Sequence, residues 1–224
     1  MGFISNWYTR EAKVEIKKDT PPKEGAALFF DVLRREFWEL CKLNLMLILF
    51  CVPVVTMPAA LTAMSRVIMF MLMDRPVSTF GEFFDTFKKE WKRATIMGLI
   101  YFPLLALTVF GQYFYLAAAG SFLPYAVAML SCAMVVIAGF YMFPMLAVLD
   151  LGLAGILKNA ILLTFLRMPQ NILALIVAVL LALLVLMLLP LSILAALFIL
   201  FALIGLVTTF CAYTGLKKHV IKEE

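Results

Sequence analysis

The sequence predicts an all-α membrane protein: a polytopic transmembrane helical bundle of about six membrane helices, with amphipathic helices at the cytoplasmic interface. Apolar residue types make up 65% of the 224 residues and charged types only 15%, against roughly 45–50% and about 25% in soluble domains. The mean hydropathy is +1.03. Charged residues are also absent from three long runs, 43–65, 94–149 and 168–216. One span takes about 20 apolar residues, so these runs predict several crossings and exclude a disordered chain or a large soluble domain.

The basic residues lie between these runs and thereby predict the topology. All 19 Lys and Arg fall before, between or after the three runs. Under the positive-inside rule, residues 66–93, 150–167 and 217–224 are cytoplasmic. The runs 94–149 and 168–216 are each long enough for two spans, so each is expected to form a hairpin. The far-side turns of these hairpins are expected at Gly120–Pro124 and Leu189–Ser192.

The first membrane segment allows more than one interpretation. Residues 1–27 form a polar cytoplasmic tail, and a single membrane domain follows over residues 28–216. Within it, residues 37–73 are expected to form a hairpin with Pro58 in the first turn of its second arm, which leaves both termini cytoplasmic. Two alternatives stay open. One is a re-entrant loop through Val52–Ala60, and the other is a single crossing that puts the N-terminus outside and gives five helices.

Residues 79–93 are expected to form a helix that lies flat on the cytoplasmic leaflet. Aromatic residues recur in it at helical spacing, and basic residues gather toward its end. This pattern is typical of a helix bound to a bilayer surface that carries anionic lipid. Thr79 and Glu82 have the spacing of a capping box. The aromatic stripe consists of Phe80, Phe83, Phe84, Phe87 and Trp91, and the basic residues include Lys88, Lys92 and Arg93.

A second cytoplasmic helix is expected over residues 151–167. It is much more apolar than the helix over 79–93, so we expect it to contact protein rather than lipid. Hairpins and cytoplasmic helices then alternate along the membrane domain, and residues 217–224 form a cytoplasmic tail.

The residue types that carry enzymatic chemistry are sparse. The only histidine, His219, lies in the charged tail, and the four cysteines are scattered without a CxxC spacing. No phosphate-binding, dinucleotide-binding or zinc-protease motif is present. We therefore expect no catalytic residue, no cofactor, no metal and no nucleic-acid partner. The lipid bilayer is the expected surrounding of the chain.

One ionisable residue, Arg66, lies next to an apolar run, and such a residue is a functional hypothesis by default. Asp150 or Asp74 is its expected partner. The favoured interpretation is a structural ion pair or an arginine that extends to the interface, and the alternative is a contact with a solute. The candidate intramembrane polar and turn site consists of Arg66, Pro53, Thr56 and Pro58.

Two segments carry a resemblance to a known family. They are LNLMLILFCVPVVTMPAALTAM (43–64) and FGEFFDTFKKEWKRAT (80–95), and their order resembles the YesL-like integral membrane proteins of Gram-positive bacteria. The shared features are a Leu-rich span, a Pro-Val-Val-Thr turn and a segment rich in Phe and Lys. The stretch LDLGLAGILKNAILLTF (149–165) resembles the second cytoplasmic stretch of the family. Met57-Pro58 departs from it, because members more often carry a glycine there.

The resemblance implies a multi-pass protein of the bacterial cytoplasmic membrane, and it leaves the activity open because the family has no established function. The genes of its members often lie beside carbohydrate uptake and polysaccharide-degradation systems. We therefore expect a non-enzymatic accessory or docking component whose partner is a sugar transporter subunit or another membrane protein. The alternative is an independent small-solute carrier or channel.

Overall fold

The computed structural model describes residues 25–118, 122–187 and 196–219. Helices and short connections account for all of these residues, with no strand among them, so the predicted all-α class is confirmed. The helices are α2 (Ala26–Arg35), α3 (Phe37–Cys51), η1 (Val54–Thr56), α4 (Met57–Leu72), α5 (Thr79–Ala118), α6 (Phe122–Val148), α7 (Leu153–Leu166), α8 (Met168–Met187), η2 (Ala196–Leu200) and α10 (Phe201–His219).

Several of these helices are long and apolar enough to cross a membrane, which confirms the membrane class. In the described ranges they number four, or five if the bent pair α7 and α8, which meet at 94°, counts as one span. About six were expected. Helix α3 is in neither count, because its 15 residues extend ~22 Å, short of the ~30 Å of a bilayer core. Helix α8 counts only together with α7. The four are Val54–Leu72, Thr79–Ala117, Phe122–Val148 and Phe198–Lys217.

Helices α3, α4 and α10 pack closely and form one part of the core. Small residues allow the close approach: a Cβ added at Gly205 of α10 would lie 2.6 Å from Met64 Cε of α4. Asn44 of α3 accepts a hydrogen bond of 2.9 Å from the backbone N–H of Ala202. This bond satisfies an N–H in the first turn of α10, where the helix itself offers no acceptor.

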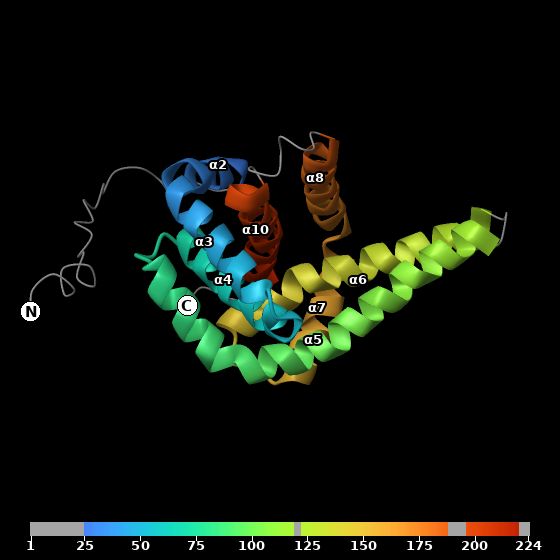
Figure 1. Cartoon of the computed structure of the whole chain (residues 1–224), viewed down its shortest axis with the longest axis horizontal. Helices are drawn as coiled ribbons and strands as arrows, with labels where there is room; N and C mark the ends of the chain where they lie inside the picture. The colour runs from blue at the N-terminus through green and yellow to red at the C-terminus, as the bar shows by residue number, and fades with distance from the viewer. Residues whose placement is uncertain (1–24, 119–121, 188–195, 220–224) are drawn as a thin grey trace, which may run out of the picture.

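Helix α5 is one continuous helix of 40 residues, ~60 Å long. The sequence separated a surface helix over 79–93 from a span beginning at residue 94, and the structure corrects this boundary. No proline or glycine interrupts the chain between Trp91 and Met97, so nothing ends the helix there. Figure 1 shows that the first part of α5 curves along the bundle, and that its second part leaves the bundle beside α6 as a two-helix arm.

The corner between α2 and α3 lies near two other segments. Arg35 forms an ion pair of 2.8 Å with Asp74, directly after α4, so the beginning and the end of the first membrane segment meet. Ile199, at the beginning of the last apolar helix, lines a groove with Phe37. The sequence placed residues 37 and 189–192 on opposite faces of the membrane, and the approach of Ile199 to Phe37 departs from that expectation.

The helix ends on both sides of the first expected far-side turn are described, whereas the second expected turn is not. Helix α5 ends at Ala118 and α6 begins at Phe122, so the last three residues of the turn expected at Gly120–Pro124 already belong to α6. The turn expected at Leu189–Ser192 lies outside the described residues, as do the first 24 residues of the tail. The expected helix over 151–167 corresponds to α7, which buries Ile156, Ala160, Leu163 and Thr164 in the protein.

Candidate functional site

The turn residues of the predicted site close the connection between α3 and α4. The Thr56 hydroxyl donates to the carbonyls of Phe50 at 2.6 Å and Pro53 at 2.7 Å. Pro58 lies in the first turn of α4, where its missing N–H costs nothing. It also contacts α5, because a Cβ added at Gly98 would lie 2.2 Å from Pro58 Cγ. These residues therefore hold a turn and a helix contact.

Arg66 lies apart from this turn, eight residues after Pro58 on α4, or ~12 Å along the helix axis. Its Nε donates to Glu82 Oε1 of α5 at 2.5 Å, and its Nη1 donates to the carbonyl of Ala147 at 2.5 Å. The guanidinium also lies 4.8 Å from the centre of the Phe70 ring. The structure thus does not bring Arg66 together with the predicted turn residues, and Arg66 joins α4, α5 and α6.

These contacts correct the expectation that Asp150 or Asp74 is the partner of Arg66. Asp74 pairs with Arg35, and the acid on Arg66 is Glu82. Helices α4 and α5 run antiparallel, so Glu82 comes level with Arg66 although the two are 16 residues apart. The Glu82 side chain is therefore engaged in this ion pair, and Thr79 is already the first residue of α5 rather than the residue before it. The expected capping box is not formed.

A second arginine, Arg93 of α5, holds the link that follows α6. Arg93 donates to the carbonyl of Leu151 at 2.5 Å and pairs with Glu90 at 2.9 Å. The Glu90 side chain is only 6% exposed, so this pair fixes its position. Helix C-termini carry partial negative charge, and a cation stabilises them by about 0.3–1 kcal/mol. Arg66 and Arg93 thus anchor the C-terminal end of α6 and the link after it.

Some side chains of the aromatic stripe of α5 are buried against the protein, and others are exposed. Phe83 is fully buried, and the rings of Phe83, Phe84 and Phe87 lie 5.4, 5.9 and 4.9 Å from the ring of Phe50 on α3. Phe80 and Trp91 remain 66% and 44% exposed. The expectation that all five aromatic residues contact lipid is therefore corrected for Phe83, because α3 covers it.

The basic residues of the same segment lie toward the outside. Lys88 lies 4.5 Å from the centre of the Phe84 ring, and Lys92 is exposed. These cations and the exposed side chains of Phe80 and Trp91 form a surface of the kind that binds at a membrane interface.

A buried polar cluster that the sequence did not reveal joins α6, α8 and α10. The Tyr141 hydroxyl donates to Asn171 Oδ1, and the Cys211 thiol donates to the same oxygen at 3.3 Å. Asn171 Nδ2 in turn donates to the carbonyls of Leu163 and Thr164 at 3.2 and 3.0 Å. These carbonyls end α7, so Asn171 caps α7 at the bend into α8.

Arg167 extends this cluster from the bend to α10. Its Nη1 donates to the carbonyl of Cys211 at 3.1 Å and to the Thr214 hydroxyl at 2.8 Å. Gly215 is needed for this approach, because an added Cβ would lie 3.0 Å from Arg167 Nη1 and 3.1 Å from Tyr141 Cε1. The only signal in the sequence was Arg167 beside Pro169, which marks a helix break. Asn171 and Tyr141 carry no recognisable spacing.

The cluster is a set of satisfied hydrogen bonds and offers no metal site. Groups of three or more His, Cys, Asp or Glu that could hold a metal ion are absent from the part of the chain that the structure describes. Chemically, the arrangement fixes helix ends and the 94° bend between α7 and α8.

Comparison with known proteins finds one family model that matches part of the chain. Residues 40–111 match the family model described as "Protein of unknown function, DUF624". The match spans α3, α4 and most of α5, and it therefore contains Pro53, Arg66, Glu82 and the aromatic stripe. No curated protein matches the chain, and no solved structure matches it. The chain is thus similar over these residues to a family of uncharacterised proteins.

Proposed function

We propose that this protein is a non-enzymatic membrane component that docks on another integral membrane protein through the arm formed by α5 and α6. The arm supports the proposal because its outer part leaves the bundle (Figure 1) and exposes a row of apolar and aromatic side chains. Some of them are Leu107, Phe110, Tyr113, Phe114 and Leu116 on α5, with Leu123, Val127 and Leu130 on α6.

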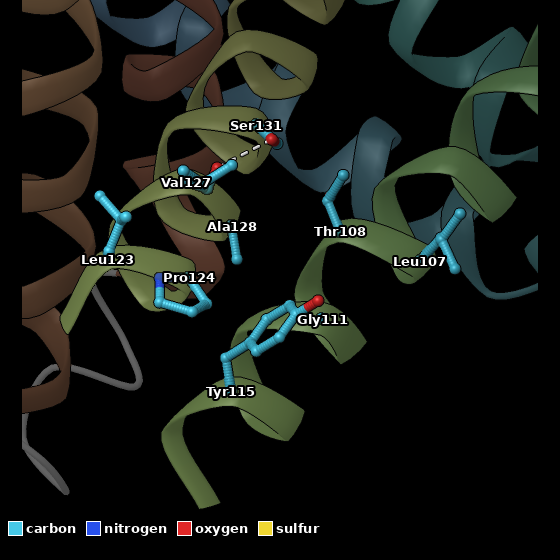
Figure 2. A pocket seen from close by; sticks show the side chains of 9 residues that line it. All are labelled: Leu107, Thr108, Gly111, Tyr115, Leu123, Pro124, Val127, Ala128 and Ser131. Atoms are coloured by element: carbon cyan, nitrogen blue, oxygen red, sulfur yellow. Dashed lines mark hydrogen bonds between the residues drawn. The ribbon is translucent and has the colours of Figure 1, made fainter. Parts of the chain in front are cut away.

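A groove of about 410 Å³ between the two helices of the arm marks the place of contact. Figure 2 shows Thr108 and Gly111 on α5 facing Ala128 and Ser131 on α6, with Tyr115 and Pro124 at one end. Small and hydroxylated residues of this kind line contacts between membrane helices, because they let backbones approach closely. A transmembrane helix of a partner is therefore the proposed occupant of the groove.

The contacts of Arg66 weigh against a site for an anionic solute at this residue. Such a site would need a cation whose charge is available, and both Glu82 and the Ala147 carbonyl already engage this guanidinium. The likeness to YesL-like proteins carries the narrower proposal that the partner is a subunit of a sugar transporter in the bacterial cytoplasmic membrane. An independent carrier is the competing outcome of the experiment.

The test is photocrosslinking in native membranes. We expect a photoreactive amino acid at Thr108 to capture one integral membrane protein, and the same amino acid at Leu180 on exposed α8 to capture none. Gly111→Phe fills the groove and should abolish the adduct without disturbing the fold, because nothing lies within 4 Å of a Cβ at Gly111. Leu180→Phe is the matched control. An absent Thr108 adduct, together with solute uptake by the purified protein in liposomes, contradicts docking and supports a carrier.

A further inference from the structure

A second groove lies between the corner of α2 and α3 and the beginning of the last apolar helix. Its volume is about 510 Å³. Five of its six lining residues are apolar, and the sixth is an arginine. They are Phe30, Leu33, Arg34, Phe37, Ile199 and Leu203. An apolar channel with one cation suits a molecule that has a hydrocarbon part and an anionic part.

Helix geometry places the cation on the groove side of α2. Phe30, Leu33 and Arg34 are spaced by one, three and four positions and share one face of α2, and Phe37 lines the groove from the beginning of α3. Asp31 lies three positions before Arg34, about 60° around the axis, but its carboxylate pairs with Arg35 at 3.8 Å.

The acidic residues of this region are engaged by other cations. Arg35 pairs with Asp31 at 3.8 Å, with Glu36 at 2.9 Å and with Asp74 at 2.8 Å. Burial lowers the pKa of the Arg35 guanidinium, but these acids outweigh burial and raise that pKa. Lys42 holds Glu39 at 2.7 Å. Arg34 is exposed, and it has no ion pair with any residue in the described ranges.

We infer that this groove binds an anionic phospholipid, with an acyl chain between Leu33, Phe37 and Leu203 and the phosphate on Arg34. Arginine suits this role because its planar donors match a phosphate in two hydrogen bonds. The apolar walls give affinity for any acyl chain, and Arg34 gives the preference for a negative headgroup. The site is independent of the arm proposed to dock a partner.

The experiment is native mass spectrometry of the full chain released from nanodiscs that contain equal amounts of phosphatidylglycerol and phosphatidylcholine. We expect the wild-type protein to retain phosphatidylglycerol preferentially. Arg34→Gln should lower that preference about fivefold, the fold-change that corresponds to roughly 1 kcal/mol for one basic residue near an anionic lipid surface. Leu203→Trp should fill the groove and lower retention of both lipids.

Two matched variants control for charge and for bulk. Lys158→Gln removes an exposed cation on α7, and Leu173→Trp adds the same bulk on the exposed face of α8; both should retain lipid as the wild type does. The thermal unfolding midpoint of each variant reports whether it is folded. Since Arg34 is exposed, Arg34→Gln tests the site even if Leu203→Trp unfolds. Unchanged lipid preference in Arg34→Gln, or an equal loss in Lys158→Gln, would overturn the inference.

Discussion

At the scale of single residues, Arg66 is the contact whose loss we expect to be most informative. Arg66→Leu leaves Glu82 and the Ala147 carbonyl without their donor. Removing one partner of a fully buried pair costs about 3–5 kcal/mol, and the two side chains are 27% and 28% exposed, so we expect about 1–3 kcal/mol. Arg66→Lys keeps the charge and should cost less. The measurement is the free energy of unfolding in detergent.

A double-mutant cycle separates the ion pair from other effects of the same substitution. If the pair is structural, Glu82→Leu on an Arg66→Leu background adds little, because the orphaned carboxylate is removed. Arg34→Leu, at an exposed arginine without an ion pair in the described chain, is the control and should change stability by less than about 0.5 kcal/mol. An Arg66→Leu protein with wild-type stability that no longer binds its partner or solute would instead make Arg66 a functional site.

At the scale of elements, α5 is held by the part of its aromatic stripe that α3 covers. Phe83→Ala removes a fully buried ring beside Phe50 and should cost about 3–5 kcal/mol. Phe80→Ala is the matched control, and it should cost less than about 1 kcal/mol, because Phe80 is 66% exposed. Hydrogen exchange of residues 79–93 in nanodiscs measures the difference. Equal loss of protection in both variants would mean that lipid, rather than α3, holds the whole stripe.

The same helix shows what the sequence could predict and what it could not. Periodicity and the charge-free runs predicted helices correctly, because burial in lipid or protein imposes both patterns on the chain itself. The partner of Arg66 depends on how α4 packs on α5, and no local pattern distinguishes Glu82 from Asp74 or Asp150. The cluster of Tyr141, Asn171 and Cys211 consists of neutral residues within apolar runs, so neither charge nor spacing indicated it. Tertiary packing decides these contacts.

At the scale of the whole molecule, the ion pair between Arg35 and Asp74 bears on the number of crossings. These residues lie at the two ends of the first membrane segment, and their 2.8 Å contact is what we expect of a chain that leaves and returns to the same side. A hairpin or a re-entrant loop satisfies this condition, whereas a single crossing does not. The contact therefore favours an even number of crossings between the N-terminal tail and residue 74.

Labelling of single cysteines in a cysteine-free background tests this topology. We expect cysteines at Arg10 and Asp74 to react with a membrane-impermeant maleimide in inverted vesicles and to be protected in intact spheroplasts, because both lie beside basic groups that the positive-inside rule places in the cytoplasm. A cysteine at Phe122, beside the tip of the arm, is the control and should react only in spheroplasts. If Arg10 reacted from the outside while Asp74 stayed inside, α3 and α4 would make one crossing. The pairing of Arg35 with Asp74 could not then exist in the membrane, because the two side chains would lie a bilayer core of ~30 Å apart.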